Sequence, residues 1–186
     1  VGNHSTAIGW NALISQNYST STDSNNTAVG WNSGSSISTG VENTVMGSHT
    51  ADALTDSDGN VAVGAFALST DTLGARSVSV GHGALLTQNF TTATDNYNVA
   101  VGHSAGRAIT TGIRNVLIGG LAGDALTDAD TNVAVGVNSL STDTMGSRST
   151  AVGYAALETQ NFTTATNTFN TALGYYAGQA LTTGLN

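Results

Sequence analysis

Residues 98–102 read Asn-Val-Ala-Val-Gly, and close variants of this segment return throughout the chain. Each variant has Thr or Val three places before a glycine and Val, Ile, Leu or Met directly before it, with Ala usually between them. Self-similarity of this kind is typical of stacked repeat architectures. The ten variants end at Gly9, Gly30, Gly47, Gly64, Gly81, Gly102, Gly119, Gly136, Gly153 and Gly174.

The spacing of these glycines defines a larger unit. One long interval, from Gly9 to Gly30, is followed by three shorter, equal intervals that end at Gly81, and the same order then begins again. The array thus consists of 21- and 17-residue repeats, and TQNFTTATDNYN at 87–98 returns as TQNFTTATNTFN at 159–170. We therefore expect a single repeat array over residues 1–186, with units 1–72 and 73–144 and a partial unit 145–186, and we interpret it as a section of a longer fibre.

Each repeat has the chemistry of a strand followed by a turn. Alternation places the two larger residues on one face and the small one on the other, and the glycine lets the backbone turn or another segment approach closely. A large residue lies four places after some glycines and seven places after the others, and stacked coils need this exchange to avoid voids. The residues at four places are Leu13, Leu68, Leu85, Leu140 and Leu157, and those at seven are Ile37, Leu54, Ile109, Leu126 and Leu181. The pattern predicts an all-β fold, a parallel β-solenoid of about ten coils.

Composition narrows the function. Only 9% of residues are charged, the net charge is −8, and there is no Lys, Pro or Cys. Nucleic-acid binding needs clustered basic residues, so we expect none. No apolar run is long enough to insert into a membrane, and disulfides are absent. Because so narrow a coil has a thin core, we also expect several chains to associate along the axis.

The repeats resemble those of a known class of fibre. AVGYAAL at 151–157, ALGYYAG at 172–178 and AITTGIRNVLIGGLAG at 108–123 are similar to the head repeats of trimeric autotransporter adhesins (YadA-like), and still more to bacteriophage tail-fibre repeats. The resemblance implies a left-handed β-roll, three chains side by side as a homotrimer, and a virion or extracellular, cell-surface location. Its implied partners are further copies of itself and a host cell-surface polysaccharide or protein.

The 21-residue coils carry the first candidate contact residues. Their extra residues, within 16–26, 88–98 and 160–170, should project from one edge, and loops on a rigid scaffold often bind ligands. The candidates for receptor or glycan contact there are Tyr18, Phe90, Tyr97, Phe162 and Phe169. The alternative is a bulge whose aromatic ring folds back over the coil edge.

Rings directly after the repeat glycine form matched neighbours. Trp10 pairs with Trp31, His82 with His103 and Tyr154 with Tyr175, and stacking in register should bring each pair together. The ordinary interpretation is packing between coils. The sharper one is contact of Trp10, Trp31, Tyr154 and Tyr175 with sugars, and a metal held by histidines around a threefold axis is a third.

Two acidic turns are candidates for Ca²⁺, which prefers oxygen ligands. The first contains Asp56 with Asp58, and the equivalent turn of the next unit contains Asp128 with Asp130. Asp and Asn also form plain turns, so a structural role is the alternative. We expect no other cofactor. No nucleophile, base and orienting acid recur at a suitable spacing, so we expect no enzyme.

The sequence thus predicts a structural and adhesive fibre segment, a rigid spacer whose loops contact a host surface. A bacterial trimeric surface adhesin head is one alternative. An ice-binding solenoid is another, because regular ranks of Thr on a flat face can order water.

Overall fold

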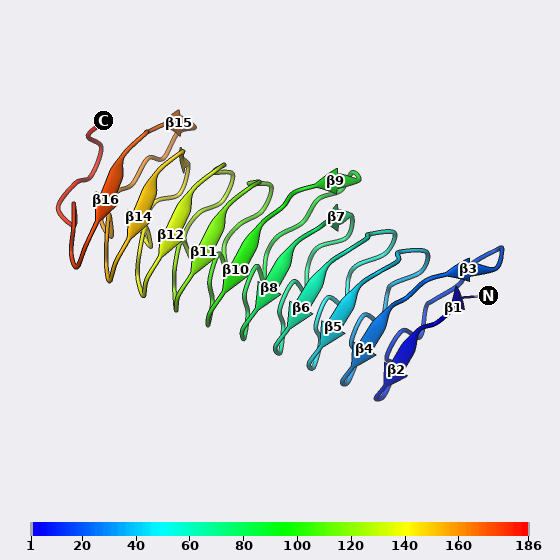
Figure 1. Cartoon of the computed structure of the whole chain (residues 1–186). Helices are drawn as coiled ribbons and strands as arrows, with labels where there is room; N and C mark the ends of the chain where they lie inside the picture. Colours follow the sequence, from blue (N-terminus) through cyan, green and yellow to red (C-terminus); the bar gives the residue numbers. More distant parts are fainter. Residues whose placement is uncertain (1, 186) are drawn as a thin grey trace.

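The computed structural model describes residues 2–185 as a stack of coils along one axis (Figure 1). Ten short strands, one per coil, form a single parallel sheet in the order β16-β14-β12-β11-β10-β8-β6-β5-β4-β2. Equivalent residues are paired, as in Val99 with Val116 and Val101 with Ile118. The predicted all-β parallel solenoid of about ten turns is confirmed. The ten strands are β2 (Thr6–Ile8), β4 (Thr27–Val29), β5 (Thr44–Met46), β6 (Val61–Val63), β8 (Val78–Val80), β10 (Val99–Val101), β11 (Val116–Ile118), β12 (Val133–Val135), β14 (Thr150–Val152) and β16 (Thr171–Leu173).

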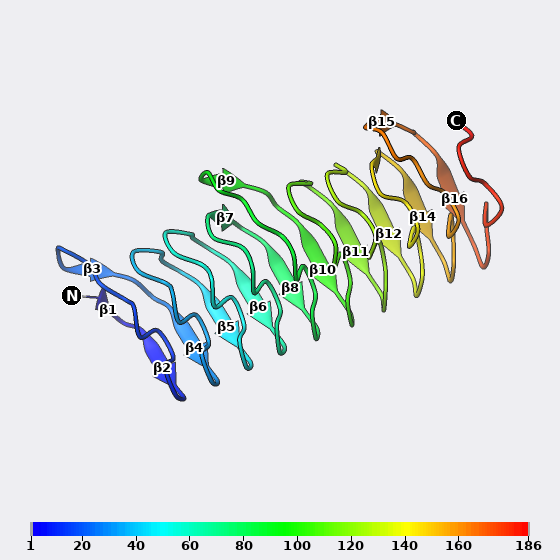
Figure 2. The same ribbon diagram turned by 180° about the vertical axis from the view of Figure 1, so that it is seen from behind.

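The 21-residue coils, which we call the wide coils, add three small parallel sheets along one edge of the stack (Figure 2). They pair β1 (Gly2–Asn3) with β3 (Thr22–Asp23), β7 (Gly74–Ala75) with β9 (Thr94–Asp95), and β13 (Gly146–Ser147) with β15 (Thr166–Asn167). The described residues contain no helix that could cross a membrane.

The middle residue of nearly every strand faces the interior and is small in most of them, whereas the first and third residues face outward. Ala62, Ala100 and Ala134 are fully buried, whereas their neighbours in the strands are partly exposed. This direction follows from the narrow coil, because the opposite wall already inserts a leucine or isoleucine toward the sheet. A small side chain therefore fits beneath most strands, and the larger Val45 and Leu117 lie where the opposite wall has a glycine.

The exchange between positions four and seven after the glycine is a volume rule, as predicted. Leu85 and Ile109 are fully buried in neighbouring coils. A side chain in place of Gly106, at position four, would come within 3.2 Å of Ile109 and within 2.7 Å of Leu117. The space that a glycine leaves is therefore filled by the large residue three places later, and here also by a strand residue, Leu117.

An asparagine before most strands forms a ladder through the interior. Asn98, Asn115 and Asn132 are fully buried, and the side-chain oxygen of each of the first two accepts a hydrogen bond from the backbone N–H of the next (2.9 Å in both cases). The Asn115 amide also donates to the Ala129 carbonyl across the coil (2.8 Å). The ladder thus satisfies backbone groups that the short strands leave unpaired.

The residue five places before each repeat glycine adopts a left-handed backbone conformation. Thr131 has φ 60° there, and its counterpart one unit earlier is Gly59 with φ 66°. β-Branched residues are strained in this region, at about 1 kcal/mol, whereas glycine is not.

We therefore expect Thr131→Gly to stabilise the chain by about 0.5–1 kcal/mol, because it relieves strain at an exposed site. Gly59→Thr should destabilise it by a similar amount, although the only atom near an added Cβ is 3.8 Å away. Denaturant midpoints of the two variants and the parent check this. Equal midpoints would show that the stacked coils tolerate the conformation at no cost.

Candidate functional site

The wide coils bury one ring each inside their base. Tyr18, Phe90 and Phe162 are only 7%, 6% and 8% exposed. The Tyr18 hydroxyl donates to the carbonyl of Gly40 (2.5 Å). These three rings therefore cover the coil edge, as the alternative interpretation expected, and they offer almost no surface to a receptor. The other two candidates of these coils, Tyr97 and Phe169, are 47% and 54% exposed.

A buried polar network fixes the second and third wide coils, and sequence reasoning did not find it. The carboxylate of Asp71 accepts the backbone N–H groups of Gly74 and Phe90 (both 3.0 Å) and the amide of Gln88 (2.6 Å). The Gln88 oxygen in turn accepts from Asn98 (2.9 Å). The available signal was a pair of segments, STDT at 69–72 and TQN at 87–89, which return together at 141–144 and 159–161.

The second copy of the network has the same geometry. The carboxylate of Asp143 accepts from Gly146 (3.0 Å), Phe162 (2.9 Å) and Gln160 (2.6 Å). A fully buried carboxylate is stable only with such partners. The network therefore holds the projecting loops of these two wide coils in one position.

The exposed base of each of these two wide coils combines a cation with a ring. The guanidinium of Arg76 lies 5.9 Å from the centre of the Tyr97 ring, and its ion pair with Asp95 holds it there. The hydrogen bond to Tyr97, with the Asp95 charge, raises the pKa of Arg76 further above neutrality. One unit later, Arg148 lies 5.6 Å from the centre of the Phe169 ring.

Residues one or two places after the repeat glycine form a ridge of mostly aromatic side chains, which we call the aromatic edge. His82 stacks on His103 with ring centroids 5.5 Å apart, and Tyr154 stacks on Tyr175 with ring centroids 5.4 Å apart, as predicted. The Trp31 ring instead contacts the His49 ring of the next coil, with their centroids 4.4 Å apart. Hydrogen bonds with Tyr175 and Tyr154 raise the pKa of Tyr176 to about 12. The edge comprises Trp10, Trp31, His49, Phe66, His82, His103, Leu121, Val137, Tyr154, Tyr175 and Tyr176.

The geometry of this edge favours packing over sugar stacking for most of its rings. A sugar stacks on a free ring face. The faces of Tyr154 and Tyr175 lie against each other at 18°, and those of His82 and His103 at 8°. Contact with a receptor by Trp10, Trp31, Tyr154 or Tyr175 stays a prediction, and Trp10, 73% exposed, has the most available surface of the four.

Between the wide-coil edge and the aromatic edge runs the outer face of the ten-stranded sheet, which we call the strip. It presents the two larger residues of every strand, and none of these side chains is charged. Ile8, Met46, Ile118 and Leu173 on this face are 38–78% exposed. One column of this face is apolar in all ten strands, and an exposed apolar column of this length is a candidate interaction surface.

The acidic turns brace neighbouring coils. Asp58 accepts a hydrogen bond from the backbone of Val41 and Asp130 from that of Ile113, both at 2.8 Å. Asp56 and Asp128 accept from threonine hydroxyls of the preceding coil, at 2.6 and 2.7 Å. Over residues 2–185, no three His, Cys, Asp or Glu side chains gather where they could hold a metal ion. Calcium binding stays a prediction that rests on these four carboxylates.

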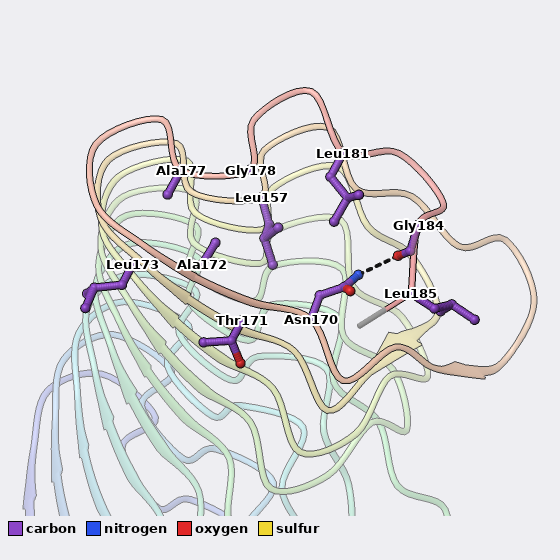
Figure 3. A pocket seen from close by; sticks show the side chains of 10 residues that line it. All are labelled: Leu157, Asn170, Thr171, Ala172, Leu173, Ala177, Gly178, Leu181, Gly184 and Leu185. Atoms are coloured by element: carbon purple, nitrogen blue, oxygen red, sulfur yellow. Dashed lines mark hydrogen bonds between the residues drawn. The ribbon is translucent and has the colours of Figure 1, made fainter.

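The hollow at the last coil is the open end of the stack. Leu157, Ala172 and Leu181 line it, and its only drawn hydrogen bond joins Asn170 to Gly184 (Figure 3). These are the repeat's own core positions, so the hollow is the uncovered end of the interior of the stack. No family model matches the chain, and no curated protein or solved structure matches it either.

Proposed function

We propose that this chain is a structural and adhesive fibre segment that works as a bundle of identical chains. The observation that carries the proposal is the uncharged strip on the outer face of the sheet. It runs the full length of the solenoid, without interruption, from β2 to β16. A solenoid with no partner on this strip would leave its apolar side chains in water.

The strip together with its two flanking edges is large enough to hold copies together. Ten strands about 4.8 Å apart make it about 45 Å long, and the three-residue strands with both flanking edges make it about 20 Å wide. The resulting area, about 900 Å², is comparable with the roughly 800 Å² per partner of a stable interface.

Three copies fit the shape of the strip. Each strand contributes only two outward side chains, so the apolar centre is about 10 Å wide, close to the distance at which sheets pack face to face. The resemblance to bacteriophage tail-fibre and adhesin-head repeats supports the same number.

The repeats favour a tail fibre or similar appendage over a cellular adhesin head, because the 17- and 21-residue coils are longer than the usual adhesin-head repeat. In this role the stack is a rigid spacer outside the cell or on a virion. The exposed tips of the wide coils, with Tyr97 and Phe169 at their base, are its candidate contacts with a host polysaccharide or protein. Catalysis has no part in the proposal.

Charge placed on the strip should separate the copies. Val101 lies in the middle of the face, paired with Val80 and Ile118. We expect Val101→Glu to shift the sedimentation mass from trimer toward monomer while the circular dichroism spectrum stays unchanged, since a buried unpaired carboxylate is costly. Thr92→Glu, at an exposed loop tip, adds the same charge and should leave the mass unchanged. A parent chain that sediments as a monomer at all concentrations would refute the proposal.

Ice binding is the second candidate, because the same strip is flat and regularly spaced. Thr occupies the first outward position in β2, β4, β5, β14 and β16, but Val does so in the five middle strands. Met46 and Leu173 also break the evenness of the other column. Thermal hysteresis in the parent chain, lost in Val101→Glu, would favour this function over assembly.

A further inference from the structure

A second ladder of residues borders the strip on the side opposite the aromatic edge. It consists of the residues five places before each repeat glycine, all with left-handed backbone. Three of the four arginines of this acidic chain lie in it, so we call it the arginine edge. Its members are His4, Asn25, Glu42, Gly59, Arg76, Tyr97, Arg114, Thr131, Arg148 and Phe169.

We propose that neighbouring copies join by these two different edges, the arginine edge of one chain packing on the aromatic edge of the next, with parallel axes and equal coils at equal height. The inference rests on the proposed function and adds its orientation and contacts. Such an interface is heterologous, and it closes into a ring when each copy turns by one third of a circle.

Matching the two edges level by level supports this arrangement. A threefold axis along the solenoid keeps every coil at the height of its copies, so the two edge residues of one coil meet across the interface. Arg148 then meets the level of Tyr154, and His4 meets that of Trp10, whose 73% exposed ring is a cation–π partner for a charged histidine. Glu42 then faces His49, whose Nδ1 lies 3.0 Å from the carboxylate of Asp52 in its own chain.

The sizes at these levels are complementary too. Gly59, which has no side chain, meets the level of the exposed ring of Phe66, 41% exposed. Arg114, a long side chain, meets the level of Leu121, which is 38% exposed. An antiparallel pair would instead bring Arg148 against the first coils and lose these matches.

A pair of cysteines tests the arrangement cleanly, because the chain has none of its own. In Arg148→Cys/Tyr154→Cys the two thiols lie on opposite sides of β14, and six extended residues separate them by about 20 Å. A disulfide requires Cα atoms within about 7 Å, so the two cannot join within one chain. Mild oxidation should shift the protein from a monomer band to a covalent trimer band on a denaturing, non-reducing gel.

Three controls make the result decisive. Each single cysteine variant should stay monomeric on the gel, whereas an isologous interface would give covalent dimers from one of them. Arg76→Cys/Tyr154→Cys places the thiols four coils apart, about 19 Å along the axis, and should also stay unlinked. Linkage of that pair would show a staggered assembly and overturn the inference.

Sedimentation of the unoxidised Arg148→Cys/Tyr154→Cys variant separates the two proposals. A trimer that fails to cross-link refutes the edge pairing and leaves assembly intact. If the parent chain and this variant both sediment as monomers, both proposals are refuted.

Discussion

Replacing Gly119 by alanine is expected to destabilise the chain by more than about 4 kcal/mol, a loss that single substitutions rarely reach. An added Cβ would lie 2.5 Å from both the carbon and the oxygen of the Gly136 carbonyl, in the next coil. The backbone there has φ 134°, which alanine rarely adopts. Neither atom is the flexible end of a side chain, so the two coils must move apart.

The loss should also divide the array. Stacked repeats are stable through contacts between neighbours, so separating β11 from β12 interrupts the ladder in the middle. We expect denaturant unfolding, followed by circular dichroism, to change from one transition to two.

The adjacent residue supplies a matched control. Gly120 has no atom within 4 Å of an added Cβ, and its φ lies outside the range that disfavours alanine. Gly120→Ala should therefore change stability by less than about 0.5 kcal/mol. Similar losses in both variants would mean that this stretch depends on glycine flexibility and not on the close approach of coils.

The regular part of the fold was predictable because the repeat is short and chemically strict. The strand at Val99–Val101, the turn at Gly102 and the exchange between Leu85 and Ile109 all follow from spacing alone. The direction of the strand faces did not, because alternation is symmetrical. It depends on how much room the opposite wall leaves, which only the closed coil shows.

The candidate site was predictable in composition and less so in placement. Phe90 and Tyr97 share one wide coil and look equivalent in sequence, yet the first is 6% exposed and the second 47%. The difference comes from Asp71, whose carboxylate binds the backbone of Phe90 from the preceding coil. The arginine edge was missed for a related reason, since its members share a backbone conformation and not a residue type.

Replacing Asn115 by alanine is expected to cost about 4 kcal/mol, because two buried backbone groups lose their partners at about 1–3 kcal/mol each. The side chain is fully buried, accepts from the N–H of Asn132 (2.9 Å) and donates to the carbonyl of Ala129 (2.8 Å). Asn17→Ala, at an exposed position, should cost less than about 0.5 kcal/mol. Free energies of unfolding from denaturant titration measure both.

Serine tests whether the ladder needs the length of asparagine. Ser77 and Ser149 occupy the ladder natively, but each lies next to a wide coil where Gln88 or Gln160 donates to the serine oxygen (3.0 and 2.9 Å). The coil that follows Asn115 is a narrow one without such a glutamine, so a serine there would lack this donor and could not reach the Ala129 carbonyl. We therefore expect Asn115→Ser to lose nearly as much stability as Asn115→Ala. Substantial rescue by serine would show that water or a shift of the backbone satisfies these groups, and that the asparagine ladder contributes less to the stack than its hydrogen bonds indicate.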